Sequence, residues 1–406
     1  MSSCRIVKGG AASAKGFRVA GVPASIRKSG RNDVALIFAE EPCELAAVFT
    51  TNKVAAAPVI YDRMVAKRGK AQAILVNSGC ANACTGEQGM KDAEASAEAT
   101  AKRLGIGKEL VLVASTGVIG RPLPMDRLLA GMEKAAGCLE AGNAAGHEAA
   151  LAIMTTDTKP KEACATVKID GKTVTVGGMT KGSGMIEPNM ATMLGFITTD
   201  ANISQPMLKR AMLAALARSF NRVVVDGDES TNDSLFVMAS GKAGNRRITK
   251  ADGDFARFSE ALEVVAVSLA KQMAADGEGA TKFVTVKVKG AKNDRDAERA
   301  ARAIAKSPLA KTAWFGKDPN WGRVLAAVGY SGANVETMKA EIFYDRTWAF
   351  KQGKVADAKQ LKKLEAVLDK PEFEVTADLH LGEGSATIYT CDFSLDYVHI
   401  NADYTT

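Results

Sequence analysis

Short segments of β-strand character alternate with alanine-rich helical segments along the whole chain, and this alternation restricts the fold more than any other feature of the sequence. The strand candidates are apolar runs or alternating polar and apolar residues, whereas the helix candidates carry apolar residues at helical spacing. Predicted strands are 71–77, 109–114, a hairpin within 164–176, 192–198, 221–225, 283–288, 373–380, 385–393 and 397–400, and predicted helices are 86–104, 124–136, 141–154, 206–220, 262–273, 294–306 and 355–368. The order is irregular and includes hairpins. We therefore predict an α/β (α+β) fold, a layered sandwich of mixed or antiparallel sheets covered by helices.

The overall composition is that of a large folded protein. Of the 406 residues, 47% are apolar and 24% are charged, enough to build a substantial core in two or more parts. The net charge of +7 comes from scattered basic residues without interleaved aromatic residues, a pattern typical of solvated surfaces. No apolar run approaches the roughly 18 residues that a membrane-spanning helix needs. We expect neither nucleic acid nor a membrane as a partner.

Cysteine and histidine usage argues against a disulfide framework and against a zinc site. The seven cysteines are odd in number and irregularly spaced, and the N-terminus lacks the apolar core of a signal peptide. We therefore expect reduced thiols in a cytoplasmic protein. The three histidines form no HExxH pattern and there is no paired CxxC, so no metal is predicted. Cys80 and Cys84 are interpreted as two small buried residues.

The chain lacks the usual motifs for histidine-based or nucleotide-based chemistry. There is no GxSxG nucleophile elbow and no serine–histidine–aspartate arrangement around any histidine. Lys181 precedes the glycines of KGSGMI, whereas the lysine of a phosphate-binding loop follows them, and the G-x-G is too short for dinucleotide binding. These exclusions direct attention to nucleophiles that need no histidine.

The segment 181–200, KGSGMIEPNMATMLGFITTD, places the small pair Ala191–Thr192 between a loop rich in glycine and proline and a β-branched run. A threonine released as a new N-terminus would carry its own base, because its α-amine has a pKa of roughly 7.7–8.0 and lies beside the hydroxyl. Its release needs a hydroxyl residue, a small residue before it and a loop that can strain the bond, and this segment contains all three. On spacing alone, a threonine that merely packs at the start of a strand is the simpler interpretation.

The same segment closely resembles the self-cleavage segment of the ornithine acetyltransferase family, the glutamate N-acetyltransferases of arginine biosynthesis. The resemblance extends over nearly the whole chain. Its motifs are KGFRVAGV at 15–22, AAVFTTNKVAAAPV at 46–59, NSGCANACTG at 77–86, STGVIG at 115–120, TTDTKPK at 155–161, VDGDESTND at 225–233, DGEGATKFVTV at 276–286, DPNWGRVLAAVGYSG at 318–332 and YVHINADYTT at 397–406. Cys80 and Glu187 depart from the family pattern, which leaves the fine substrate preference open. The resemblance implies the family's N-terminal-nucleophile-like fold.

By this resemblance the chain cuts itself between Ala191 and Thr192, giving an α chain of residues 1–191 and a β chain of residues 192–406 that stay associated. An N→O acyl shift onto the Thr192 hydroxyl explains the cut, since it converts an amide into an ester that water can open. Thr192 then takes the acetyl group of N-acetylornithine and passes it to glutamate, which predicts ping-pong kinetics. The resemblance places the oxyanion donors at Thr116 and Gly117.

The resemblance also implies the substrate contacts and the assembly. The implied substrate-binding residues are Thr155, Lys181, Thr192, Glu278, Asn401 and Thr406. No cofactor is expected, although acetyl-CoA is a second acetyl donor in some members of the family. Two α and two β chains would form a heterotetramer. Two other functions remain open: a related self-processing aminopeptidase or amidohydrolase, and a binding protein with an idle site.

Overall fold

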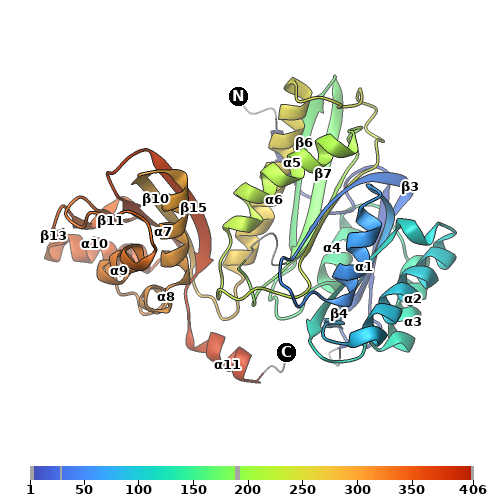
Figure 1. Ribbon diagram of the computed structural model, residues 1–406, viewed down its shortest axis with the longest axis horizontal. Helices are drawn as coiled ribbons and strands as arrows, with labels where there is room; N and C mark the ends of the chain where they lie inside the picture. The colour runs from blue at the N-terminus through green and yellow to red at the C-terminus, as the bar shows by residue number, and fades with distance from the viewer. Residues whose placement is uncertain (1–3, 28–29, 188–192, 404–406) are drawn as a thin grey trace.

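The computed structural model describes residues 4–27, 30–187 and 193–403, and it builds two sheets of unequal size (Figure 1). The large sheet and its helices form a first lobe. The small sheet, made between residues 283 and 391, forms a second lobe with its own helices and its own apolar core. The functional residues predicted from the sequence come from the ends of two strands of the large sheet, from two loops and from the last helix.

The large sheet has nine strands in the order β1-β6-β7-β8-β9-β3-β4-β5, with β2 paired to β3. Its strands are β1 (Cys4–Val7), β2 (Phe17–Val22), β3 (Val34–Phe49), β4 (Lys70–Cys80), β5 (Val111–Val118), β6 (Lys161–Ile169), β7 (Lys172–Lys181), β8 (Leu194–Thr199) and β9 (Ser234–Ala239). The pairs β4–β5 and β8–β9 are parallel, and the other neighbours are antiparallel. The sheet is therefore mixed, as predicted.

Helices cover the large sheet in two groups. They are α1 (Ala57–Ala66), α2 (Gly86–Leu104), α3 (Met125–Gly137), α4 (Asn143–Ala152), α5 (Gln205–Arg218) and α6 (Gly253–Ala275). Helix α6 packs mainly on β6 and β7 and helix α5 mainly on β3, whereas α1 to α4 pack around β2 to β5, and the two groups lie in separate apolar cores. Alanines four residues apart, Ala93, Ala97 and Ala101, form the buried stripe of α2. Such small side chains let a helix lie close to its neighbours.

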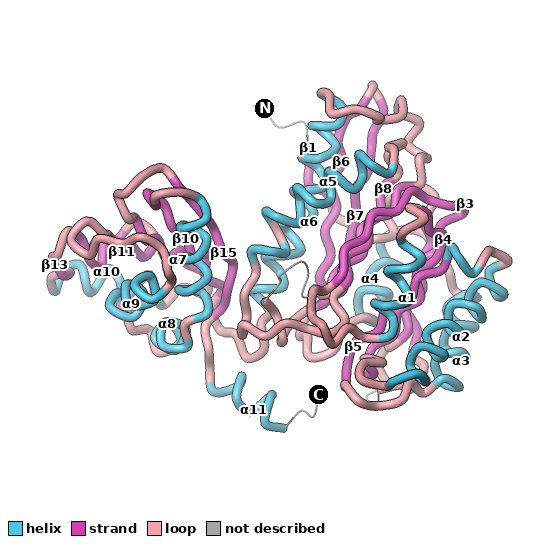
Figure 2. The backbone as a smooth tube through the Cα atoms, viewed as in Figure 1, coloured by secondary structure: helices cyan, strands magenta, loops and turns pink. Residues whose placement is uncertain are grey.

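The second lobe contains a six-stranded sheet in the order β13-β12-β11-β14-β10-β15. Its elements are β10 (Phe283–Ala291), α7 (Asp294–Lys306), α8 (Pro308–Phe315), α9 (Trp321–Tyr330), β11 (Glu341–Tyr344), β12 (Thr347–Lys351), β13 (Lys354–Val355), α10 (Ala358–Leu368), β14 (Glu372–Asp378) and β15 (Gly384–Cys391). The last helix, α11 (Leu395–Asp403), leaves this lobe and runs back towards the first (Figures 1 and 2).

Most predicted elements are present, and two are wrong. The predicted strand at 397–400 is part of helix α11, where Ser394 accepts a hydrogen bond from the Asp396 amide in the first turn. The predicted strand at 221–225 begins inside a 3₁₀ turn, Phe220–Arg222, and then forms a single bridge from Val223 to Tyr389 of the second lobe. In both places local capping or a tertiary contact overrides the strand preference of a short β-branched run.

The predicted division at residue 191 separates two strands of the large sheet and does not coincide with the boundary between the lobes. Strands β7 and β8, which lie on either side of it, pair along their length from Val176↔Thr199 to Lys181↔Leu194. Strand β8 then continues into the sheet beside β9. The two predicted chains would therefore share one sheet.

Candidate active site

One small pocket collects every described residue that the sequence assigned to catalysis or substrate binding. It is a cavity of about 130 Å³ at the ends of β5 and β7, closed by the loop before β9 and by helix α11. The predicted residues that line it are Thr116, Gly117, Thr155, Lys181, Glu278 and Asn401. The other predicted residues, Ala191, Thr192 and Thr406, lie outside the described part of the chain.

Two anchored ends lie on either side of the predicted cleavage bond. On the N-terminal side, both oxygens of Asp226 accept hydrogen bonds, at 2.6 Å from the amide of Met185 and at 2.8 Å from that of Ile186. Glu187 forms an ion pair of 2.5 Å with Lys306 of the second lobe. On the C-terminal side, strand β8 begins two residues after Thr192 and is fully buried. The segment that would be cut is thus fixed at both described ends.

Lys181 is the buried cation of this pocket. It ends β7, its residue is 9% exposed, and its Nζ lies 3.3 Å from the hydroxyl of Thr116. Burial lowers the pKa of Lys181, and the charges of Asp157, Asp233 and Glu278 act against that effect. A compact ammonium group in such a place suits the carboxylate of a small substrate.

A buried ion network lies behind Lys181, and the sequence did not assign it a role. Lys161 Nζ lies 2.6 Å from Asp157 Oδ1 and 2.6 Å from Asp276 Oδ2. Asp157 also accepts hydrogen bonds from the amides of Thr155 and Gly182. Burial would raise the pKa of Asp157, but Lys181 and Lys161 outweigh it and hold the pKa well below its usual range. Asp157 therefore carries a charge that fixes both walls of the pocket.

The pair Thr116–Gly117 lies in the last part of β5, where the pairing of this strand with β4 becomes irregular. Gly117 has φ +132°, and a Cβ there would overlap the backbone of Gly79 and Cys80, so only glycine fits. Asn232, just before β9, donates to the carbonyl of Ser115 at 2.8 Å. Since Thr116 Oγ1 accepts from Lys181, its own hydrogen is free to point into the pocket. The Thr116 hydroxyl can therefore donate a hydrogen bond to a negative oxygen in the pocket.

Glu278 and Asn401 join the two lobes at the pocket. Glu278 is 7% exposed, and its Oε2 accepts a hydrogen bond of 2.7 Å from Asn401 Nδ2 on helix α11. The Glu278 amide donates to the carbonyl of Ser183, which holds the carboxylate against the loop before the cleavage bond. A buried carboxylate in this position can receive the ammonium group of a substrate.

Gly184→Ala provides a test of the Glu278 position without altering a charged group. A Cβ on residue 184 would overlap the Glu278 carboxylate, so we expect that carboxylate to shift away from the pocket. The KM for an amino-acid substrate should rise roughly 10- to 100-fold with little change in the melting temperature. Steady-state kinetics checks this, with Gly137→Ala as the control, because a Cβ at residue 137 meets open space. An unchanged KM would contradict the assigned position.

The two residues that depart from the family pattern, Cys80 and Glu187, both have defined contacts in the structure. Cys80 is buried at the end of β4 and its thiol lies 3.4 Å from the carbonyl of Arg121, whereas Cys84 is exposed at a position with φ +56°. The expectation that both cysteines are buried therefore holds only for Cys80. Glu187 anchors the cleavage loop to the second lobe through Lys306. Neither side chain lines the small pocket.

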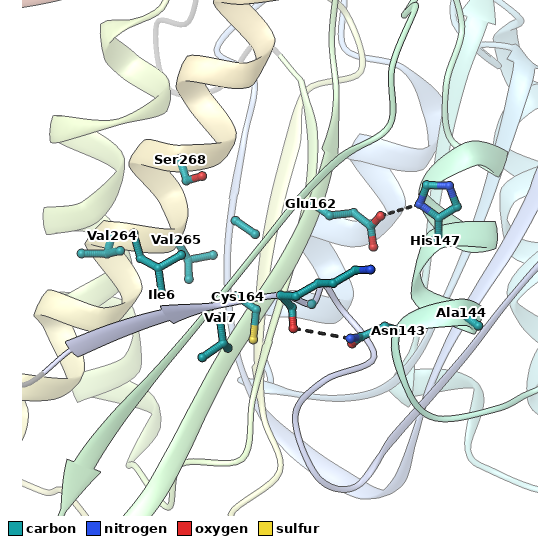
Figure 3. Close-up of a pocket in the computed structure, with 13 residues that line it drawn as sticks. Ile6, Val7, Asn143, Ala144, His147, Glu162, Cys164, Val264, Val265 and Ser268 are labelled. Atoms are coloured by element: carbon teal, nitrogen blue, oxygen red, sulfur yellow. Dashed lines mark hydrogen bonds and ion pairs between the residues drawn. The ribbon is translucent and has the colours of Figure 1, made fainter.

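A larger cavity elsewhere contains none of the predicted residues. It measures about 640 Å³ and lies among β1, β6, α4 and α6, where an ion pair joins His147 and Glu162 (Figure 3). Much of its lining is aliphatic, with Val264 and Val265 on one side (Figure 3). Size alone would point to this cavity, but the small pocket has the convergent cation, carboxylates and backbone donors that chemistry on a polar substrate requires.

Two further kinds of feature are absent from the described residues. None of the helices between residues 4 and 403 combines the length and apolar character needed to cross a bilayer. Within the same described ranges, no three histidine, cysteine or acidic side chains lie together as a metal site would require.

The mixed sheet, the helices on it and the small charged pocket at its end define an enzyme that acts on a small polar molecule. Residues 18–406 match the model of the ArgJ family, and the chain belongs to that family. It is 52% identical to the arginine biosynthesis bifunctional protein ArgJ of Geobacter sulfurreducens, over 97% of this chain and 99% of the relative. It is 50% identical to the ArgJ protein of Symbiobacterium thermophilum, over 98% and 99% of the two chains.

A solved structure agrees with the fold. The ArgJ protein of Bacillus halodurans matches with a TM-score of 0.51 at 43% identity, covering 52% of this chain and 100% of that one. Together with the family match, this confirms the predicted family and fold class. The family match and the two ArgJ relatives also confirm the prediction of an acyltransferase of arginine biosynthesis.

Proposed function

We propose that the chain transfers the acetyl group of N2-acetyl-L-ornithine to L-glutamate through an acetyl ester on Thr192, giving L-ornithine and N-acetyl-L-glutamate. The observation that carries this proposal is the convergence of Thr116, Gly117, Lys181 and Glu278 on one pocket, with Lys181 paired in the sheet to the second residue after Thr192. These residues are far apart in the sequence and come from both predicted chains.

Each group has a chemical task in this reaction. The Thr192 hydroxyl attacks the acetyl carbonyl, and its own α-amine takes the proton. The Thr116 hydroxyl and the Gly117 N–H stabilise the resulting oxyanion, and one such donor typically contributes about 10²–10³ in rate. Lys181 receives the substrate carboxylate and Glu278 an ammonium group. Thr155, Asn401 and Thr406 are the further substrate contacts that the family resemblance implies.

The charges of the pocket support an amino-acid substrate. Lys181 provides one cation, whereas Asp226, Asp228 and Glu278 bring carboxylates to the lining. Ornithine carries one carboxylate and two ammonium groups, so this balance suits it. Glutamate needs the same cation for its α-carboxylate. One site can therefore serve both half-reactions in turn.

Self-cleavage at Ala191–Thr192 is part of the proposal, and strand pairing supports the expectation that the two products stay together. Strand β7 of the α chain pairs with β8 of the β chain, and β9 of the β chain pairs with β3 of the α chain. Separating the chains would break both strand pairs and expose their apolar faces to water. A cytoplasmic heterotetramer of two α and two β chains, without a cofactor, completes the proposal.

The test is to supply N-acetylornithine to the purified protein with and without glutamate. We expect ornithine release to depend on glutamate, and N-acetylglutamate to appear in equal amount. Water is the competing acceptor. If ornithine forms equally fast without glutamate, acetyl transfer is contradicted and the alternative of a self-processing amidohydrolase or aminopeptidase is supported. Acetyl-CoA as the sole donor, in a parallel reaction, shows whether the chain also starts the pathway.

A further inference from the structure

Helix α11 forms one wall of the small pocket although it has little packing of its own. None of its residues, Leu395–Asp403, is buried. Yet Tyr397 and Asn401, one turn apart on the same face of the helix, both line the cavity. A short helix is only marginally stable in water by itself, so contacts outside the helix must hold it in place. Those contacts decide how the pocket is closed on this side.

Several of these contacts lie at the start of the helix. The Ser394 hydroxyl, directly before α11, donates a hydrogen bond of 2.6 Å to the carbonyl of Gly279. The ring of Phe393 stacks on the ring of Tyr397, with ring centres 4.7 Å apart and 19° between the ring planes. A Cβ on Gly279 would overlap the backbone of Tyr397, so the loop that follows Glu278 lies directly against this turn. Tyr397 is thereby held beside Glu278.

Lys311 is a fully buried lysine that contacts the segment leading into α11. It lies on α8 and is 0% exposed. Its Nζ donates a hydrogen bond of 2.7 Å to the Thr390 hydroxyl and another to the carbonyl of Cys391. The same nitrogen lies 4.6 Å from the centre of the Phe393 ring, and the Phe393 amide donates to the Lys311 carbonyl. Lys311 therefore connects the end of β15 to the aromatic pair that begins α11.

None of these partners of Lys311 is a carboxylate, which is unusual for a buried lysine. Taking an ammonium group out of water is costly, and buried lysines are normally paired with acidic groups. Burial lowers the pKa of Lys311, whereas Cys391, Asp392 and Asp226 act against this shift. An apolar side chain of similar volume would avoid the cost of burying the amino group. The amino group is therefore best explained by what it holds in place, which includes the Phe393 ring.

We propose that Tyr397 is a further substrate-binding residue of the pocket and that Lys311 is a positioning residue, which holds Tyr397 in place through the Phe393 ring. This inference deepens the proposed function and rests on it, because its substrate is N2-acetyl-L-ornithine. The carbon chain and the side-chain ammonium group of that molecule suit an aromatic face beside a carboxylate. Tyr397 provides the face and Glu278 the carboxylate.

The first test is steady-state kinetics of the full-length protein with N-acetylornithine as the varied substrate. We expect Tyr397→Leu, Phe393→Leu and Lys311→Met each to raise KM roughly 5- to 30-fold, with kcat changed less than about twofold. Phe393→Tyr keeps the stacked ring and should have the wild-type KM. Val398→Ala is the control, because Val398 lies on the same helix and is 62% exposed. An unchanged KM in Tyr397→Leu would overturn the substrate contact.

The second test determines whether Lys311 acts through Phe393. The double variant Lys311→Met/Phe393→Leu should raise KM no more than the more damaging of its two single variants, because both substitutions remove the same link. Independent effects would multiply instead, and a multiplied KM would overturn the positioning role of Lys311.

The third test is hydrogen exchange at the backbone amides of α11, which needs neither substrate nor turnover. We expect these amides to exchange at least about 10-fold faster in Lys311→Met and Phe393→Leu than in the wild type and in Val398→Ala. Unchanged exchange in Phe393→Leu would overturn the positioning role even if Lys311→Met does not fold, since Phe393 is only half-buried. If exchange changes as expected but the wild type does not use N-acetylornithine, the proposed function fails while the link from Lys311 to α11 is supported.

Discussion

Thr192→Ala is expected to leave the chain as one uncut band and to abolish acetyl transfer. Alanine has no hydroxyl to accept the acyl group of residue 191, so neither the α chain nor the β chain can form. The same substitution removes the nucleophile of the transferase reaction. Losses of a covalent nucleophile reach roughly 10⁶-fold in kcat. Electrophoresis of the purified protein and an assay of ornithine release check the two effects on one sample.

Thr192→Ser is the matched variant for this experiment, since it keeps a hydroxyl at the same place. We expect partial cutting and partial turnover, because the primary hydroxyl can carry out both acyl transfers. Mass spectrometry should then find a fragment that begins at residue 192. A fully active wild-type enzyme in which the bond between Ala191 and Thr192 is intact would refute the mechanism.

Lys181→Met should produce the second-largest effect, a fall of roughly 100-fold in kcat/KM, expressed mainly as a higher KM. Methionine fills a similar volume but leaves the substrate carboxylate buried without its cation, a change that typically costs about 3 kcal/mol. Burial lowers the pKa of Lys181. Lys181 therefore loses its ammonium form at a lower pH than an exposed lysine does. The wild-type KM should begin to rise at that lower pH, because the substrate carboxylate then loses its cation.

Lys159→Met is the control for Lys181→Met, because it makes the same chemical change at an exposed lysine near the pocket. We expect wild-type kinetics from it. Comparable KM values for the two variants would mean that Lys181 does not bind the carboxylate. Thermal melting of both proteins separates a binding effect from a general loss of stability, since Lys181 also contributes to holding Asp157 charged.

Local elements with strong signals could be predicted from the sequence with accurate ends. Helix 86–104 was predicted with the bounds it has, and it ends at Gly105 in the left-handed conformation that favours glycine. Helix 294–306 was also predicted with its bounds, and Asn293 caps its first turn. In contrast, the sequence predicts a strand at 397–400, and the structure has a helix there. Four residues carry too little periodic information to separate the two structures.

The site was only partly predictable. Motif resemblance identified Thr116, Gly117, Lys181 and Glu278, and the structure brings these four together. No pattern in the sequence pointed to the network of Lys161, Asp157 and Asp276 or to Asn232, although these residues lie within recognised motifs. Their importance depends on burial and on partners more than a hundred residues away, such as Asp276 for Lys161.

The sequence by itself determined the class of fold, the family and the candidate nucleophile, because these depend on local periodicity and on an ordered set of motifs. Only the tertiary structure decided that β7 and β8, the strands on either side of the predicted cut, pair in one sheet, and that Asp157 is buried against Lys161 and Lys181. The physical reason is that strand pairing and desolvation act between distant segments. A carboxyl group acquires an unusual protonation state only when folding removes it from water and fixes its neighbours.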